Sequence, residues 1–195
     1  MFVTFEGLDG CGKTTQAVLL ADALRGDGVE VVSTREPGGT PLGEAIRDLV
    51  LHGGHVAPWA EAALYAASRA QHVDGVIRPA LERGATVVCD RYIDSSVAYQ
   101  GVGRGLGLEE VLALNLAVVG GLLPDRTVLV EIDPETAAER VGSSGDRIER
   151  DGIALWRRVA GAYRTLAERY PERYVVVDGR RSVAEVAEEI RDRLR

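Results

Sequence analysis

The sequence predicts an α/β domain in which helices cover both faces of a five-stranded parallel sheet. Three observations support this fold class. Five short apolar runs alternate with longer runs of helical composition. A glycine-rich loop separates the first apolar run from the first helical segment. The run at 85–89 is almost continuously apolar, which is typical of a central strand in a parallel sheet.

The length and composition fit one domain spanning residues 1–195, without repeats or linkers. The formal net charge of −7 argues against a nucleic-acid-binding surface, which needs a basic face. No apolar run is long enough to span a membrane, and no secretion signal precedes the first predicted strand. The sequence leaves open a disulfide between Cys11 and Cys89 but suggests no disulfide framework, so we expect a cytoplasmic protein.

The first predicted strand, 1–5, leads into the segment Gly-Leu-Asp-Gly-Cys-Gly-Lys-Thr, and a helix is predicted after it at 15–25. This segment fits the phosphate-binding pattern G-x-x-x-x-G-K-[ST]. Glycines let backbone N–H groups turn inward around a phosphate, and the helix N-terminus adds partial positive charge. We expect Lys13 to reach the outer phosphates and the Thr14 hydroxyl to hold Mg²⁺. The predicted nucleotide-phosphate site comprises Gly7, Leu8, Asp9, Gly10, Cys11, Gly12, Lys13, Thr14 and Thr15.

Lys13 is the only lysine in the chain, and every other one of the 23 Lys and Arg residues is arginine. A compact ammonium can act as a point charge where a guanidinium fork cannot. The presence of the single lysine in the loop therefore favours a functional phosphate site over the alternative of a chance glycine turn.

A second strand is predicted at 29–34, followed by the segment Arg-Glu-Pro-Gly-Gly-Thr. This segment is either a polar surface turn or a substrate loop, because open α/β sheets bind ligands at the carboxyl ends of their strands. The Glu36–Pro37 bond could be cis or trans. The next helix, predicted at 41–51, carries Arg47.

His52 and His55 have a spacing that could bind metal, but without nearby cysteines we do not expect a zinc site. A long helix is predicted at 58–83, with a bend between 75 and 79. It contains His72, which we expect to pack or to form hydrogen bonds.

The strand at 85–89 ends in Asp90 and Arg91. In phosphate-loop enzymes an acidic residue at this point holds Mg²⁺, so Asp90 is predicted to be a metal ligand together with Thr14. The alternative is that Asp90 caps the next helix. The glycine-rich segment 102–107 follows no strand and is predicted to be a loop.

The rest of the chain continues the alternation of helices and strands. Asp133 and Pro134 are typical of a helix start. The polar segment 141–150 is either a mobile lid or a plain surface loop. The remaining elements are predicted as helices at 108–120, 151–170 and 182–194 and strands at 126–132 and 173–178.

Several classes of phosphate-binding protein can be excluded. Regulatory GTPases read guanine with an Asn-Lys-x-Asp motif, and this chain has no second lysine. Motor ATPases need a longer chain. Adenylate-kinase-like loops usually have proline where this chain has Asp9, so a different small-molecule kinase remains.

Six sequence blocks together resemble bacterial thymidylate kinases, from residue 1 to about residue 178. The blocks are Phe5–Thr15 (FEGLDGCGKTT), Arg35–Thr40 (REPGGT), Ser68–His72 (SRAQH), Asp90–Tyr92 (DRY), Ser95–Gly101 (SSVAYQG) and Asp146–Glu149 (DRIE). The resemblance implies a three-layer P-loop kinase fold with a short lid at about 141–150. It also implies transfer of the γ-phosphoryl group of ATP to dTMP, giving dTDP and ADP with Mg²⁺, and a homodimer.

The resemblance also implies roles for residues of the dTMP site. Asp9 accepts a hydrogen bond from the sugar 3′-hydroxyl, and Arg69 approaches the thymine edge. Tyr65 stacks on thymine, although an aromatic residue at helical spacing could instead belong to the core. The residues Ser96, Tyr99 and Gln100 line the base and sugar pocket, with Tyr99 disfavouring a 2′-hydroxyl.

The resemblance further implies that Arg47 and Arg91 hold the acceptor phosphate, although Arg47 could be a solvated helix residue. Because the second pKa of a phosphate monoester is about 6, the acceptor needs no general base at neutral pH. Catalysis is then positioning and charge neutralisation by Lys13 and arginines. The phosphate loop contains no basic residue besides its lysine, and for such a loop the resemblance implies arginines in the lid. The short segment 142–145 carries none, so we expect Arg147 or Arg140 to close over the transferred group.

Two alternatives remain at this stage. The first is a kinase that acts on another nucleotide or on a deoxynucleoside. A deoxynucleoside accepts the phosphoryl group on a hydroxyl, which would need a base such as Glu6 or Asp9. A non-enzymatic nucleotide-binding module is the other, and the combination of Lys13, Thr14 and Asp90 argues against it. The sequence leaves the dimer interface and the discrimination between dTMP and dUMP open.

Overall fold

The computed structural model describes residues 1–142 and 152–194. Its centre is a five-stranded sheet in the order β2-β3-β1-β4-β5, and all neighbouring strands are parallel. The predicted fold class is therefore confirmed. The strands are β1 (Phe2–Glu6), β2 (Val31–Arg35), β3 (Thr86–Asp90), β4 (Arg126–Glu131) and β5 (Tyr174–Asp178).

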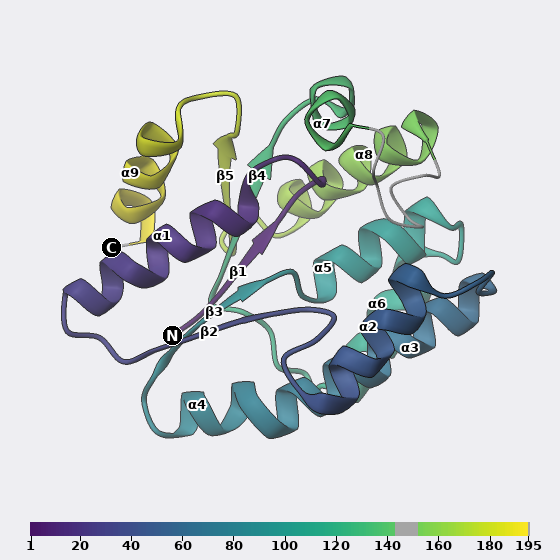
Figure 1. Ribbon diagram of the computed structural model, residues 1–195, viewed down its shortest axis with the longest axis horizontal. Coiled ribbons are helices and arrows are strands. Elements are labelled where there is room, and N and C mark those ends of the chain that lie inside the picture. Colours follow the sequence, from purple (N-terminus) through teal and green to yellow (C-terminus); the bar gives the residue numbers. More distant parts are fainter. Residues whose placement is uncertain (143–151, 195) are drawn as a thin grey trace.

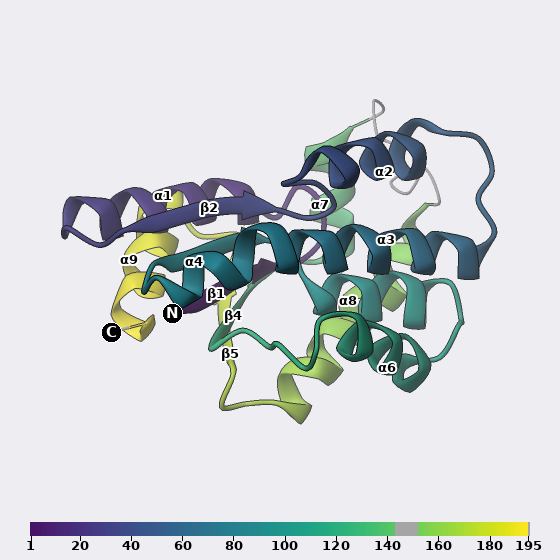
Figure 2. The ribbon, with the colours of Figure 1, turned by 90° about the horizontal axis from the view of Figure 1, so that it is seen from below.

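Helices cover both faces of the sheet (Figure 1). On one face α1 contacts β1, β2 and β3, and α9 contacts both β5 and α1. On the other face α4 contacts β3 and α8 contacts β4. The helices α2 and α3 lie side by side (Figure 2). The helices are α1 (Lys13–Gly26), α2 (Pro41–His52), α3 (Pro58–His72), α4 (Arg78–Glu82), α5 (Ile93–Ser96), α6 (Leu108–Val118), α7 (Pro134–Val141), α8 (Ile153–Arg169) and α9 (Val183–Leu194).

Local sequence signals account for much of this architecture. The central strand β1 is buried at every position, as expected for a strand covered on both faces. Thr40 caps α2 by accepting a hydrogen bond from Gly43 N at 3.0 Å. The predicted helix start at Asp133 is confirmed, because its carboxylate accepts a hydrogen bond from Thr136 N at 2.8 Å.

The predicted continuous helix at 58–83 is interrupted. Residues Val73–Ile77 form a π-helical turn, η1, between α3 and α4, so the bend lies close to its predicted position. His72 at the end of α3 is fully buried and hydrogen-bonded, which confirms its predicted packing and hydrogen-bonding role.

The prediction of a loop at 102–107 is partly wrong, because a second π-helical segment, η2 (Val97–Gly103), extends into it. Packing explains the difference. A Cβ atom on Gly103 would lie 2.7 Å from Leu155 Cδ1, and one on Gly101 would lie 3.1 Å from the carbonyl oxygen of Gly107. The glycines here allow η2 to pack closely against its neighbours, and this tertiary packing overrides their low helix propensity.

The sheet brings two chain segments together at its carboxyl edge. Phe5 of β1 is in register with Asp90 of β3, and Arg91 N donates a hydrogen bond to Phe5 O at 2.9 Å. The loop that follows β1 and the polar residues that follow β3 therefore emerge side by side. This edge is where open α/β sheets bind their ligands.

In the described part of the chain, no helix combines the length and the apolar character needed to cross a membrane. Cys11 and Cys89 are both buried and free, so the disulfide that the sequence left open is not formed.

Candidate active site

The glycine loop between β1 and α1 has the backbone conformation that its sequence predicts. Gly7, Gly10 and Gly12 have φ values of 139°, 77° and 95°. Gly7 has no room for a side chain, because a Cβ atom there would lie 2.5 Å from Val130 O. The loop therefore lies tightly against β4, and α1 starts directly after it at Lys13. This is the geometry that directs backbone N–H groups toward a bound phosphate.

The carboxylate of Asp9 lies between two cations. Its Oδ1 is 3.0 Å from Lys13 Nζ and 2.5 Å from Arg91 Nη2. The hydroxyl of Tyr99 donates a hydrogen bond to its Oδ2 at 3.2 Å. Burial opposes ionisation of Asp9, but the charges of Arg91 and Lys13 outweigh it and hold the pKa of the carboxyl well below its usual range.

Arg91 connects the loop to the end of β3. Its Nη1 donates hydrogen bonds to Gly7 O at 3.2 Å and to Ser95 Oγ at 3.0 Å, and its guanidinium lies 5.2 Å from the centre of the Tyr99 ring. Its φ of 70° is uncommon for a residue with a side chain. Such backbone strain is frequent at functional sites, where surrounding contacts hold it in place.

Thr14 and Asp90 face each other across the same edge. The Thr14 hydroxyl donates a hydrogen bond to Asp90 Oδ2. The other oxygen, Asp90 Oδ1, is buried and has no hydrogen-bond partner among the described residues. Asp90 does not cap the following helix, since Tyr92 occupies the N-cap position of α5. A hydroxyl and a carboxylate with an unsatisfied oxygen are the hard oxygen donors that suit Mg²⁺.

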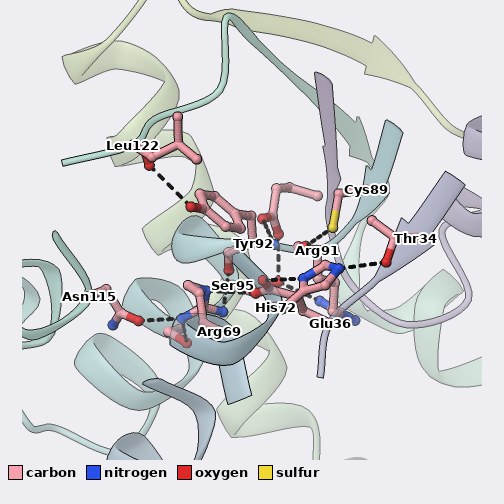
Figure 3. A network of polar contacts seen from close by, with 12 residues as sticks. Thr34, Glu36, Arg69, His72, Cys89, Arg91, Tyr92, Ser95, Asn115 and Leu122 are labelled. Atoms are coloured by element: carbon pink, nitrogen blue, oxygen red, sulfur yellow. Dashed lines mark hydrogen bonds and ion pairs between the residues drawn. The ribbon is translucent and has the colours of Figure 1, made fainter. Parts of the chain in front are cut away.

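A second, fully buried network surrounds Arg69 on α3 (Figure 3). Arg69 Nε donates to Glu36 Oε2 at 2.6 Å, and Nη2 donates to Tyr92 O at 2.9 Å. Nη1 donates to Ser96 Oγ at 2.9 Å and also to Asn115 Oδ1. His72 Nδ1 lies 2.9 Å from the other oxygen of Glu36. The network fixes the guanidinium of Arg69 at the pocket wall.

Glu6, at the end of β1, forms a third buried group of contacts. Its carboxylate accepts hydrogen bonds from Tyr92 N at 2.8 Å, Ser95 Oγ at 2.5 Å and the Tyr163 hydroxyl at 3.0 Å. Burial, with the charge of Asp94, raises the pKa of Glu6 to about 7. Glu6 therefore supports Ser95, which in turn contacts Arg91.

Members of these networks line a cavity of about 100 Å³ beside the glycine loop. Three arginines and two tyrosines are among its twelve lining residues. The lining residues are Asp9, Glu36, Pro37, Arg47, Leu51, Tyr65, Arg69, Arg91, Ser95, Ser96, Tyr99 and Gln100. A pocket that combines apolar surface with a few convergent charged groups is the usual form of a small-molecule site.

Comparison with known proteins agrees with this geometry. The family model described as "Thymidylate kinase" matches residues 5–190. The chain belongs to the thymidylate kinase family. It is 55% identical to the thymidylate kinase of Leifsonia xyli subsp. xyli, over 100% of this chain and 94% of the relative. It is 52% identical to that of Clavibacter michiganensis subsp. michiganensis, over 99% of this chain and 93% of the relative.

A solved thymidylate kinase structure, from Ehrlichia chaffeensis, superposes with a TM-score of 0.83 at 35% identity and covers 100% of this chain and 97% of that one. The resemblance that the six sequence blocks indicated is confirmed. The chain therefore has dTMP kinase activity, the phosphorylation of dTMP to dTDP. ATP is the phosphoryl donor in the thymidylate kinase family.

For a thymidylate kinase, the residues predicted for dTMP lie together. All eight of them line the cavity: Asp9, Arg47, Tyr65, Arg69, Arg91, Ser96, Tyr99 and Gln100. Arg47 is half-buried rather than fully solvated, and its Nη1 donates a hydrogen bond to Pro37 O at 3.0 Å. Tyr65 is half-buried, and it packs against the hydrophobic core as well as lining the cavity. Their roles toward the nucleotide stay predictions.

The predicted lid arginines have different positions. Arg140, near the end of α7, donates hydrogen bonds to Gly10 O at 3.3 Å and Gly179 O at 3.1 Å, so it lies next to the glycine loop. Arg147 and most of the predicted lid at 141–150 lie outside the described residues.

Sequence reasoning did not assign four residues of the cavity wall: Glu36, Pro37, Leu51 and Ser95. The first two belong to the segment at 35–40, which the sequence left as a turn or a substrate loop. The structure favours the loop, and the Glu36–Pro37 bond is cis. Ser95 lies in a block that carried the resemblance, whereas no local signal singles out Leu51.

Proposed function

We propose that dTMP binds in the cavity beside the glycine loop and that Lys13, Arg91 and Arg47 neutralise the phosphates during transfer. The observation that carries this proposal is the convergence of the eight predicted residues on one cavity next to the loop. Arg91 and Arg47 line the cavity from two different elements: Arg91 follows the end of β3, and Arg47 lies on α2. Two guanidinium groups suit bidentate contact with an acceptor phosphate.

The chain's own carboxylates support transfer to a phosphate rather than to a hydroxyl. A hydroxyl acceptor needs a general base, for which Glu6 and Asp9 were the candidates. Glu6 is fully buried and already accepts three hydrogen bonds. Asp9 is a weak base, because Arg91 and Lys13 keep its pKa low. Catalysis then rests on positioning and charge neutralisation, as is usual in phosphoryl transfer.

We assign Mg²⁺ to Thr14 and Asp90 and the ATP phosphates to Gly7, Leu8, Asp9, Gly10, Cys11, Gly12, Lys13, Thr14 and Thr15. The metal assignment is supported by the two carboxylate oxygens of Asp90: Oδ2 faces the hydroxyl of Thr14, and Oδ1 has no partner among the described residues. The ion would neutralise negative charge on the phosphates. The ammonium group of Lys13 contacts the carboxylate of Asp9, and it would exchange this contact for one with a phosphate when ATP binds.

Donor counting supports a role for Arg69 in reading the base. Its guanidinium has five N–H donors, and Glu36, Ser96, Asn115 and Tyr92 O accept four of them among the described residues. One Nη2 donor therefore remains for the cavity, and thymine O4 is an acceptor. In the same site Tyr65 stacks on the ring, while Ser96 and Gln100 line the base.

For the sugar, we propose that Asp9 accepts a hydrogen bond from the 3′-hydroxyl. Tyr99 lies next to Asp9, with its hydroxyl 3.2 Å from Oδ2, and from this position it would disfavour a 2′-hydroxyl. Burial and the charge of Asp9 raise the pKa of Tyr99, so its hydroxyl stays protonated and donates. These contacts would favour a deoxynucleotide.

We propose that Arg140 or Arg147 is the arginine that closes over the transferred phosphoryl group. Arg140 already lies against Gly10 of the loop, which supports its candidacy. Near-normal kcat in both Arg140→Ala and Arg147→Ala would exclude this assignment.

We further propose that the single domain of 1–195 works as a homodimer in the cytoplasm, independently of nucleic acid and membranes. Exposed apolar residues on neighbouring helices, Leu42 and Leu49 on α2 and Trp59 on α3, support self-association. The two free cysteines suit a reducing compartment. Light scattering coupled to size exclusion tests the dimer, and a monomer at micromolar concentration would contradict it.

The site assignment is tested by ADP release with ATP and Mg²⁺, offering dTMP, dUMP, dCMP, AMP and thymidine in parallel. We expect strong preference for dTMP in the wild type. Arg47→Ala should raise KM for dTMP at least about tenfold, because it removes a charge-assisted contact. Arg83→Ala, an exposed arginine at the end of α4, is the matched control. Turnover of thymidine or AMP but not of dTMP would overturn the acceptor site.

A further inference from the structure

A buried carboxylate stands behind the base pocket. Glu61 lies on α3, is 1% exposed and does not line the cavity. Its Oε1 accepts a hydrogen bond from Gln100 Nε2 at 2.9 Å. Arg104 donates to both of its oxygens, from Nε to Oε1 at 3.1 Å and from Nη2 to Oε2 at 3.2 Å. The arginine supplies the positive charge that a buried carboxylate needs, so Glu61 acts as an anionic anchor between α3 and η2.

This contact determines which end of the Gln100 amide faces away from Glu61. A carboxylate flanked by an arginine offers only acceptors, so the amide must turn its NH₂ group toward it. Gln100 is 2% exposed and lines the cavity. Among the described residues its side chain forms hydrogen bonds through Nε2 only. The amide oxygen Oε1, the acceptor, is therefore the end available to the pocket.

We propose that Glu61 determines the pyrimidine selectivity of the site, although it does not touch the base, by fixing Gln100 with its amide oxygen toward the base. This inference rests on the proposed binding of dTMP in the cavity. Thymine carries a donor at N3 and an acceptor at O4. The amide oxygen of Gln100 pairs with the N3–H group, and the remaining donor of Arg69 pairs with O4. Cytosine reverses both groups, with an acceptor at N3 and an NH₂ group at C4, so both contacts become repulsive.

The substitution Glu61→Gln tests this role with little change in shape. A neutral amide can turn its NH₂ group toward Gln100, which gives up the contact with Arg104 Nε, while its oxygen still accepts from Arg104 Nη2. Gln100 can then reverse and present its own NH₂ group to the base, which matches cytosine N3. We expect the ratio of kcat/KM for dTMP over dCMP to fall at least about tenfold, mainly through KM for dTMP, because a hydrogen-bond mismatch of this kind is worth that much.

Three comparisons separate this role from a merely structural one. Glu61→Asp keeps a group that only accepts, so it should retain more of the selectivity than Glu61→Gln. The dTMP-to-dUMP ratio should stay within about twofold in Glu61→Gln, because both bases carry N3–H. Glu109→Gln, which alters an exposed carboxylate paired with Arg169, should change neither ratio. A dTMP-to-dCMP ratio in Glu61→Gln equal to that of the wild type would overturn the proposal.

Two further measurements keep the test decisive. If Glu61→Gln does not fold, binding of dTMP and of its N3-methyl derivative to the wild type is compared by calorimetry. The derivative lacks the donor at N3, and equal affinity for the two ligands would overturn the proposal, whereas a loss of at least about tenfold supports it. Gln100→Ala tests the underlying site: unchanged KM for dTMP in that variant would refute base binding at Gln100 itself.

Discussion

The buried carboxylate of Glu6 makes the stability of this protein depend on pH. Glu6 is fully buried, and burial together with the charge of Asp94 raises its pKa from the ordinary value of 4.5 to about 7. The folded protein therefore binds a proton at Glu6 more tightly than the unfolded chain does. This contribution to stability is fully present below pH 4.5 and is lost as the pH rises through 7.

The magnitude follows from the two pKa values. At pH 5.5 the preference of the folded state for the proton contributes roughly 2 kcal/mol, at 1.36 kcal/mol per pKa unit, and at pH 8 it contributes almost nothing. Glu6→Gln is neutral at every pH and loses this dependence. We therefore predict that the free energy of unfolding of Glu6→Gln, relative to the wild type, increases by about 2 kcal/mol from pH 5.5 to pH 8.

Urea unfolding at pH 5.5, 6.5, 7.2 and 8 measures this difference directly. Glu109→Gln is the control, since it alters a carboxylate that is 63% exposed and lies outside the contacts of Glu6. If the free energies of unfolding of Glu6→Gln and the wild type ran parallel across the range, to within about 0.5 kcal/mol, the raised pKa of Glu6 would be refuted.

Three further predictions concern the cations and the metal site. Lys13→Ala should lower kcat at least about hundredfold with little change in KM for dTMP, because Lys13 acts on charge that develops in transfer; an unchanged kcat in steady-state assays would contradict this. Asp90→Asn should raise the Mg²⁺ concentration for half-maximal activity at least about tenfold, through loss of a charged ligand, and superimposable Mg²⁺ titrations would disprove the metal role. Arg69→Met leaves the buried carboxylate of Glu36 without its arginine partner, with only His72 beside it, and should lower the free energy of unfolding by about 3–5 kcal/mol; a loss below about 1 kcal/mol in urea unfolding would show that the network is dispensable.

Sequence reasoning found eight of the twelve residues of the cavity wall but not the buried residues that hold them in place. Arg69 and Gln100 belong to sequence blocks with recognisable spacing, so both were predicted. Asn115 and Glu61 hold these two side chains in place from α6 and α3. Neither residue belongs to a motif, because the contact depends only on how three helical segments pack. A buried polar residue inside a helical pattern resembles a surface residue until the packing is known.

The sequence by itself determined the parts of this protein that depend on local chemistry. The glycine loop, the single lysine, the five apolar strands and the cap at Asp133 are all specified within a few residues, because backbone freedom, periodicity and capping are short-range effects. Only the tertiary structure decided the extension of η2 into the predicted loop and the networks of Glu6, Arg69 and Glu61. These depend on groups far apart in the chain that must satisfy one another's charges and hydrogen bonds once water is excluded.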